Sequence, residues 1–326
     1  MSKQSEDNVA QFRNDQSRTL TSPVTDEQLR PTSTLQRVQF STPLTEKDHQ
    51  RVAVFLESQP HVHFRLYGGY GWTPDLDFLR WYPRLKRFSV NELYHLRNFN
   101  GLQHLPDDVE VLGIGRTKGR DFSWRKLSRF DKLKCLYVEA QTKHIEATSQ
   151  LTSVETLCLT SITLPGLELL TPLKRLQSLR LSLGGTSDLA ALPALGSLSY
   201  LHLVMVRGLA DLSMLARLPS LQSLYLQALK NVTVLPSFRG LKALRRVHLE
   251  TMKGLTDLAP VAEAPNLEEL IAIDLRQIPV ENFRSFVGHW CLQGACIGLG
   301  SLKRNAEVRD LLGLPELNRY KEFEFR

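Results

Sequence analysis

The chain has 326 residues, of which 42% are hydrophobic and 23% are charged, so most of it is expected to bury a core. No stretch reaches the ~18 uncharged apolar residues of a membrane span, and the polar first twenty residues hold no apolar signal core. We therefore expect no membrane segment and a cytoplasmic location. The formal net charge is +7, which favours an acidic partner without identifying one.

The N-terminal 60 residues differ in composition from the rest of the chain. Residues 1–34 are rich in Ser, Thr, Gln and Asp and poor in large apolar side chains, which predicts a disordered tail. Residues 35–60 are expected to form a cap. A short helix should begin after Thr45, whose hydroxyl is a helix-capping group, and Val52, Phe55 and Leu56 would give that helix an apolar side.

A repeat with the template L-x-x-L-x-L fills residues 61–300. Eleven copies follow one another at intervals of 24, 24, 24, 21, 22, 22, 23, 23, 23 and 25 residues. They begin at His61, Leu85, Val109, Leu133, Val154, Leu176, Leu198, Leu221, Leu244, Leu267 and Leu292. Because a single unit cannot bury its leucines alone, stacked units must share one continuous core.

The repeat predicts an α/β solenoid. The alternating L-x-L segments are typical of half-buried strands, which would stack into a curved parallel sheet of about eleven strands. Units of 21–25 residues leave room only for short 3₁₀ or helical returns behind the sheet. Within the returns, Asp188, Asp211 and Asp257 stand where a carboxylate accepts backbone N–H groups. Residues 301–326 are expected to form a C-terminal cap with a helix at AEVRDLLGL and a closing strand at RYKEFEFR.

The repeat resembles the leucine-rich-repeat family, and within it the short internalin-like repeats of bacteria with a T-D-L-x-x-L return. The resemblance implies a horseshoe with the sheet on its concave face and the returns on its convex face. The sequence departs from the family where an asparagine usually follows each strand. Apolar residues replace it, namely Ile162, Val206, Leu229 and Met252. Those turns must satisfy their backbone groups in another way.

The alternation also predicts which side chains point away from the core. The column between the last two leucines of each unit holds Arg65, Ser89, Gly113, Tyr137, Cys158, Arg180, His202, Tyr225, His248 and Ile271. The column two residues earlier holds His63, Arg87, Val111, Cys135, Thr156, Ser178, Tyr200, Ser223, Arg246 and Glu269. Tyr and Arg are enriched among the residues that dominate binding energy at interfaces, although exposed sheets carry some of them in any case. The candidate partner-binding residues are Tyr137, Arg180, Tyr200, His202, Tyr225, Gln227, Arg246, His248 and Glu250.

Signals for chemistry are weak. The chain contains no phosphate-binding G-x-x-x-x-G-K-[ST] loop, no G-x-S-x-G elbow and no H-E-x-x-H helix. His61 and His63 share a strand face but have no further ligands at metal-binding spacing, and Cys291 with Cys296 or His289 is better explained as structural. The four cysteines fit reduced thiols. We therefore expect no enzyme activity, no cofactor and no metal site.

The function predicted from the sequence is capture of a partner protein. The chain would act as a monomeric inhibitor, immunity protein or adaptor. The two candidate columns contain no lysine, which argues against binding nucleic acid. One alternative is an effector exported by a non-Sec system that binds a host protein. A second is a substrate-binding arm of an enzyme complex. The stretch after residue 300 is too short for a catalytic domain, which argues against an enzyme with a repeat substrate-binding arm.

Overall fold

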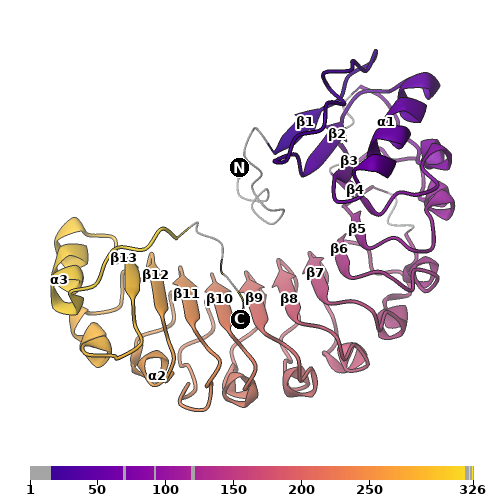
Figure 1. Ribbon diagram of the computed structural model, residues 1–326. Helices are drawn as coiled ribbons and strands as arrows, with labels where there is room; N and C mark the ends of the chain where they lie inside the picture. The colour runs from indigo at the N-terminus through magenta and orange to yellow at the C-terminus, as the bar shows by residue number, and fades with distance from the viewer. Residues whose placement is uncertain are drawn as a thin grey trace. The chain divides into compact units, whose positions relative to one another are not determined.

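The computed structural model describes residues 16–68, 71–91, 93–118 and 122–319, together with Phe323 and Phe325. The chain divides into two compact units, Met1–Ala147 and Thr148–Arg326 (Figure 1). Within each unit the strands pair in parallel with their neighbours in chain order. Between the strands, the chain returns through 3₁₀ turns and single helical turns.

The first unit contains one long helix, α1 (Glu46–Ser58), placed between its second and third strands. Its strands are β1 (Ser17–Thr19), β2 (Arg37–Phe40), β3 (His63–Tyr67), β4 (Arg87–Asn91), β5 (Val111–Ile114) and β6 (Cys135–Glu139). Its 3₁₀ helices are η1 (Asp77–Trp81), η2 (Asn100–His104) and η3 (Trp124–Leu127), and η4 (Ile145–Gln150) crosses into the second unit. Thr45 caps α1 as predicted, since its hydroxyl accepts the Asp48 N–H at 3.2 Å.

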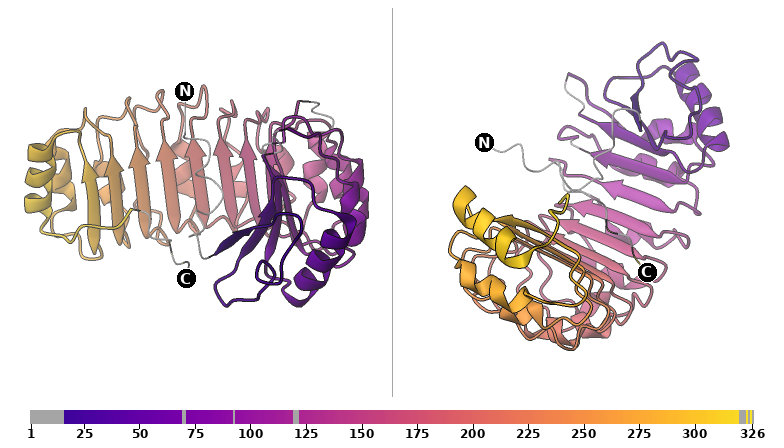
Figure 2. Two further views of the ribbon diagram at one scale, coloured as in Figure 1. Left: turned by 90° about the horizontal axis from the view of Figure 1, so that it is seen from above. Right: turned by 60° about the vertical axis from the view of Figure 1, so that its left-hand side comes forward.

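The last helix of the second unit is α3 (Leu302–Leu312), which confirms the helix expected near the C-terminus. Its strands are β7 (Thr156–Thr160), β8 (Ser178–Ser182), β9 (Tyr200–Val204), β10 (Ser223–Gln227), β11 (Arg246–Glu250), β12 (Glu269–Ile273) and β13 (Gly294–Gly298). Its returns are η5 (Glu168–Leu170), η6 (Leu192–Ala194), η7 (Ser213–Arg217), α2 (Ala259–Ala262) and η8 (Val280–Phe286). Figure 2 shows strands β8 to β13 side by side with these returns behind them.

The predicted repeat is confirmed strand by strand. Each of the eleven strands β3 to β13 begins two residues after the start of its template copy. The template leucines form the core; Leu224 and Leu226 of β10, for example, are fully buried. Among the returns, Asp188, Asp211 and Asp257 accept the N–H two residues ahead at 2.8, 2.8 and 2.9 Å. The expected carboxylate-capped turns are therefore present.

The turns after β7 to β12 show what replaces the missing asparagine ladder. The first residue after the strand takes the left-handed conformation, with φ between 49° and 59° at Ser161, Leu183, Met205, Ala228, Thr251 and Asp274. Its N–H then continues the ladder to the next repeat; Ala228 N–H, for example, donates to Glu250 O at 2.9 Å. The apolar residues that follow, including Leu229 and Met252, are fully buried. Backbone pairing and apolar stacking together satisfy these turns.

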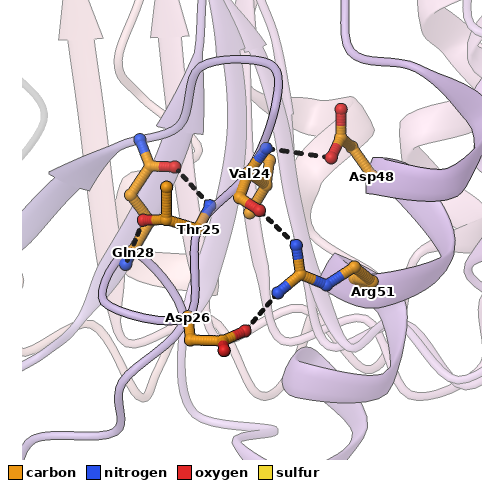
Figure 3. Close-up of polar contacts among 6 residues, drawn as sticks. All are labelled: Val24, Thr25, Asp26, Gln28, Asp48 and Arg51. Carbon is orange, nitrogen blue, oxygen red and sulfur yellow. Dashed lines mark hydrogen bonds and ion pairs between the residues drawn. The ribbon is translucent and has the colours of Figure 1, made fainter.

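The N-terminal part of the chain departs from the sequence prediction. A disordered tail was expected over residues 1–34, but residues 16–34 contain β1, which pairs with β2, and they bury Leu20 and Val24. Residues 1–15 lie outside the described part. Residues 16–34 are ordered by a long-range contact, because Asp48 of α1 accepts a hydrogen bond from Val24 N–H at 2.9 Å (Figure 3). Asp48 also accepts a hydrogen bond from Ser22 Oγ at 2.6 Å. A short polar segment is thereby held against the cap.

The Asp48 carboxylate should stabilise the N-terminal cap in a pH-dependent way. Burial alone would raise its pKa, but hydrogen bonds from Ser22, Thr45 and Val24 outweigh burial and lower the pKa from 3.8 to about 2. A carboxylate with a depressed pKa stabilises the fold above its unfolded pKa and loses that contribution as the pH falls. We expect Asp48→Asn to cost about 1–2 kcal/mol at pH 7. The measurement is urea unfolding across a pH series.

In that series the wild type should lose its advantage over Asp48→Asn as the pH falls from about 4 towards 2, where the carboxylate becomes protonated. Asp26→Asn is the matched control, because its side chain is 98% exposed and pairs only at the surface with Arg51 (Figure 3). That control should change stability by less than about 0.5 kcal/mol. Equal effects of the two substitutions would contradict the role assigned to Asp48.

Candidate functional site

Strands β8 to β11 of the second unit position the candidate site. Because side chains alternate along a strand, the second and fourth residues enter the core and the first, third and fifth stand on the opposite side, here called the open face. Register places the third residues in one row, with Tyr225 paired to His202 on one side and His248 on the other. The open-face patch consists of Arg180, Tyr200, His202, Tyr225, Gln227, Arg246, His248 and Glu250.

Three aromatic rings of the patch contact one another across neighbouring strands, one pair stacked and the other tilted. The ring centroids of His202 and Tyr225 lie 4.2 Å apart with an interplanar angle of 3°, and those of Tyr225 and His248 lie 4.2 Å apart at 59°. The Tyr200 ring follows at 6.1 Å from His202. Parallel strands repeat about every 4.8 Å, so equivalent side chains on adjacent strands meet at stacking distance. The stack leaves His202 only 6% exposed.

Hydrogen bonds fix the orientation of these rings. The Tyr225 hydroxyl lies 3.0 Å from Gln227 Oε1 and 3.2 Å from Glu250 Oε2, either of which can accept its proton. His248 Nε2 lies 3.2 Å from the same Glu250 oxygen. The Tyr200 hydroxyl lies 3.1 Å from His202 Nδ1. The patch is therefore ordered before any partner arrives, which lowers the entropic cost of binding.

The imidazoles of the patch are neutral at physiological pH. Burial, with Arg180 and His248 nearby, lowers the pKa of His202 to about 3. Burial also lowers the pKa of His248, against the opposing effect of Glu250. Burial raises the pKa of both Tyr200 and Tyr225, so their hydroxyls keep their protons. Within the described part of the chain, His202 Nε2 has no hydrogen-bond partner, which leaves one unused polar atom inside the stack.

The arginines around the aromatic rings offer a partner their planar guanidinium faces more than an unbalanced positive charge. Arg246 forms an ion pair with Glu269 on the next strand, and Arg245 pairs with Glu268 at 2.7 Å. The Arg180 guanidinium carbon lies 5.0 Å from the centre of the Tyr200 ring. Because two of these guanidinium charges are already balanced by carboxylates, the patch favours stacking over the binding of a strongly acidic surface.

The comparisons with known proteins concern the fold. No protein-family model matches the chain, and no curated protein matches its sequence. Among solved structures, it is similar to an internalin, InlF, of Listeria monocytogenes. The TM-score is 0.54 at 16% identity, and the match covers 84% of this chain and 78% of that one. The chain has a leucine-rich-repeat fold.

Two further leucine-rich-repeat structures are similar over longer or shorter spans. The internalin InlC2 of Listeria monocytogenes gives a TM-score of 0.37 at 22% identity, covering 68% of this chain and 81% of that one. The protein LIC12759 of Leptospira interrogans gives 0.42 at 17% identity, covering 96% and 97%. The fold is what this chain shares with InlF.

In this leucine-rich-repeat fold, eight of the nine candidate residues gather in the open-face patch. The ninth, Tyr137, stands in β6 of the first unit and is left outside the patch. Sequence reasoning missed Arg245 and Glu268, which precede their strands, and it missed two contacts of the patch with Phe323 and Phe325. The alternating aromatic pattern at Phe323 and Phe325 was a signal that could have drawn attention to them.

Three of the residues considered for metal binding or nucleophilic chemistry make hydrogen bonds within the fold. His63 Nε2 lies 2.7 Å from Ser89 Oγ, and burial lowers its pKa to about 3. His289 Nε2 lies 2.9 Å from the Ala264 carbonyl, while Cys291 Sγ lies 3.8 Å from Asn266 Oδ1. In the described ranges, no three His, Cys, Asp or Glu residues are grouped as a metal site, and no helix has the length and apolarity to cross a bilayer.

Proposed function

We propose that this leucine-rich-repeat protein binds a partner protein through the open-face patch, without catalysis, as an inhibitor or adaptor. The observation that carries the proposal is the prearranged cluster of Tyr200, His202, Tyr225 and His248 on the neighbouring strands β9, β10 and β11. Aromatic and arginine side chains of this kind dominate binding energy at protein interfaces. The repeat architecture supports the same conclusion, since stacked units present a broad continuous surface.

A triple substitution tests the patch. Tyr200→Ala, Tyr225→Ala and Arg246→Ala together should weaken partner binding at least about 100-fold, because residues of this type each contribute about 2 kcal/mol or more when central to an interface. Full-length protein captures its partner from a lysate of its own source, mass spectrometry identifies that partner, and titration of the purified pair gives the affinity. Far-UV circular dichroism checks that the variant is folded.

The matched control carries Arg284→Ala and Trp290→Ala, two exposed residues in the last return of the same unit. It should bind the partner as the wild type does. Full affinity in the triple variant would contradict the patch assignment. An equal loss of affinity in the triple variant and the control would also contradict it, because binding would then not depend specifically on the open-face patch.

A further inference from the structure

The segment after α3 turns back to the edge of the sheet. Leu317 N–H donates to Ala295 O at 3.1 Å, and Ala295 N–H donates to Pro315 O at the same distance, so the segment joins β13 by a short parallel bridge. Leu317 packs directly on Gly294, where a Cβ would lie 2.6 Å from Leu317 Cδ2. Figure 1 shows this segment running from α3 past β13 towards the patch strands.

Two phenylalanines further along the chain lie on the patch itself. The Phe323 ring centre is 5.1 Å from the guanidinium carbon of Arg246 and 5.2 Å from that of Arg245. The Phe325 ring packs edge-on against Tyr200, with centroids 6.0 Å apart and an angle of 77°. The two phenylalanine rings also contact each other at 5.0 Å. The patch therefore already holds a pair of aromatic side chains.

These contacts share one feature of the sheet. Gly294, Arg246 and Tyr200 are each the first residue of their strand, and Arg245 precedes one. The chain thus meets the open face along the starts of β13, β11 and β9. The arginines there are balanced by Glu268 and Glu269, which leaves their flat faces for aromatic rings. A phosphate or nucleic acid would compete with carboxylates at the same guanidinium groups.

We propose that the open-face patch recognises an aromatic-x-aromatic segment of the partner protein, and that Phe323 and Phe325 of this chain occupy the same positions until the partner displaces them. The inference rests on the proposed function and names the kind of partner segment that the patch would bind. In an extended segment, residues two apart point the same way, so one such segment can place both rings on the arginines and on Tyr200. Phe325 keeps 52% of its surface exposed, which suits a contact that is exchanged.

The test uses a labelled peptide of sequence NRYKEFEFR, matching residues 318–326, and full-length protein with Phe323→Ala and Phe325→Ala. This double variant, here called the vacated protein, should bind the peptide at least about tenfold more tightly than the wild type. In the wild type the chain's own Phe323 and Phe325 compete with the peptide at an effective concentration near the millimolar range. A peptide with alanine at both phenylalanine positions should not bind. Val287→Ala with Trp290→Ala, exposed residues elsewhere in the unit, should leave wild-type behaviour unchanged.

The outcomes separate this inference from the proposed function. No binding to the vacated protein at about 1 mM peptide, with partner capture still dependent on Tyr200 and Tyr225, would overturn the aromatic-segment inference alone. Peptide binding that survives Tyr200→Ala and Arg246→Ala in the vacated protein would also overturn it, because the segment would then bind elsewhere. Peptide binding lost on those substitutions supports it. Partner capture that ignores the patch would instead remove the proposed function.

Discussion

Replacing Trp124 by alanine is expected to destabilise the first unit by about 3–5 kcal/mol, the range found for large aromatic side chains removed from a core. Trp124 is fully buried, and its Nε1–H donates to Gln141 O at 2.9 Å. Alanine would leave both a cavity and a buried carbonyl without that donor, at a glutamine that is itself fully buried. Urea unfolding followed by far-UV circular dichroism measures the change.

Two further tryptophan variants separate the contribution of the buried ring from that of its hydrogen bond and from the effect of removing an exposed tryptophan. Trp124→Phe keeps an aromatic ring but loses the hydrogen bond, so its cost should fall between the wild type and Trp124→Ala. Trp290→Ala removes a side chain that is 79% exposed and should change stability by less than about 0.5 kcal/mol. If Trp124→Ala unfolded at the same urea concentration as Trp290→Ala, the buried contact would not support the fold.

Most of the sheet was predictable because its cause is local and repeated. Every unit carries its own L-x-x-L-x-L signal, so each strand from β3 to β13 could be located from within about six residues. The same alternation gave the rows of the open face, and the pairing of Tyr225 with His202 and His248 confirms the register. Whether those rows bind a partner is a separate matter, and it remains a proposal.

The two strands that were not predicted, β1 and β2, depend on distant contacts or match the repeat template only with other apolar residues in place of leucine. The stretch Leu35 to Phe40 fits the repeat template with Val and Phe in place of leucine, and it forms β2. β1 has only three residues in a polar segment, and its neighbour Val24 is tied down by Asp48, 24 positions away. Composition alone cannot reveal that a helix will supply the missing hydrogen bonds.

The contacts around the patch were not predicted either, because they too depend on residues far away in the sequence. Side-chain alternation predicts that Arg246 faces outward, but its ion pair with Glu269 depends on the register of the neighbouring strand. Its contact with Phe323 joins residues 77 positions apart, through a segment with no repeat of its own. A periodic sequence thus predicts which residues share a surface, whereas the partners of those residues come from the irregular parts of the chain.

The ion pair between Arg246 and Glu269 is expected to contribute strongly to the stability of the second unit. The side chains are 11% and 18% exposed, so Arg246→Ala would leave Glu269 charged in a poorly solvated place. We expect a loss of about 2–3 kcal/mol, below the cost for a fully buried pair because some solvent reaches the carboxylate. Replacing both residues, Arg246→Met with Glu269→Leu, should stay within about 1 kcal/mol of the wild type, since no charge is stranded. Urea unfolding measures all three proteins.

The double variant also separates stability from recognition at this position. It removes the guanidinium face that holds Phe323 while keeping an apolar side chain of similar length, so it should unfold like the wild type and still bind the partner more weakly. Glu268→Gln, which alters the neighbouring ion pair of Arg245 and keeps Arg246, serves as the matched control for binding. If the stable double variant retained full affinity, any loss seen in Arg246→Ala would come from destabilisation, and Arg246 would not belong to the binding surface.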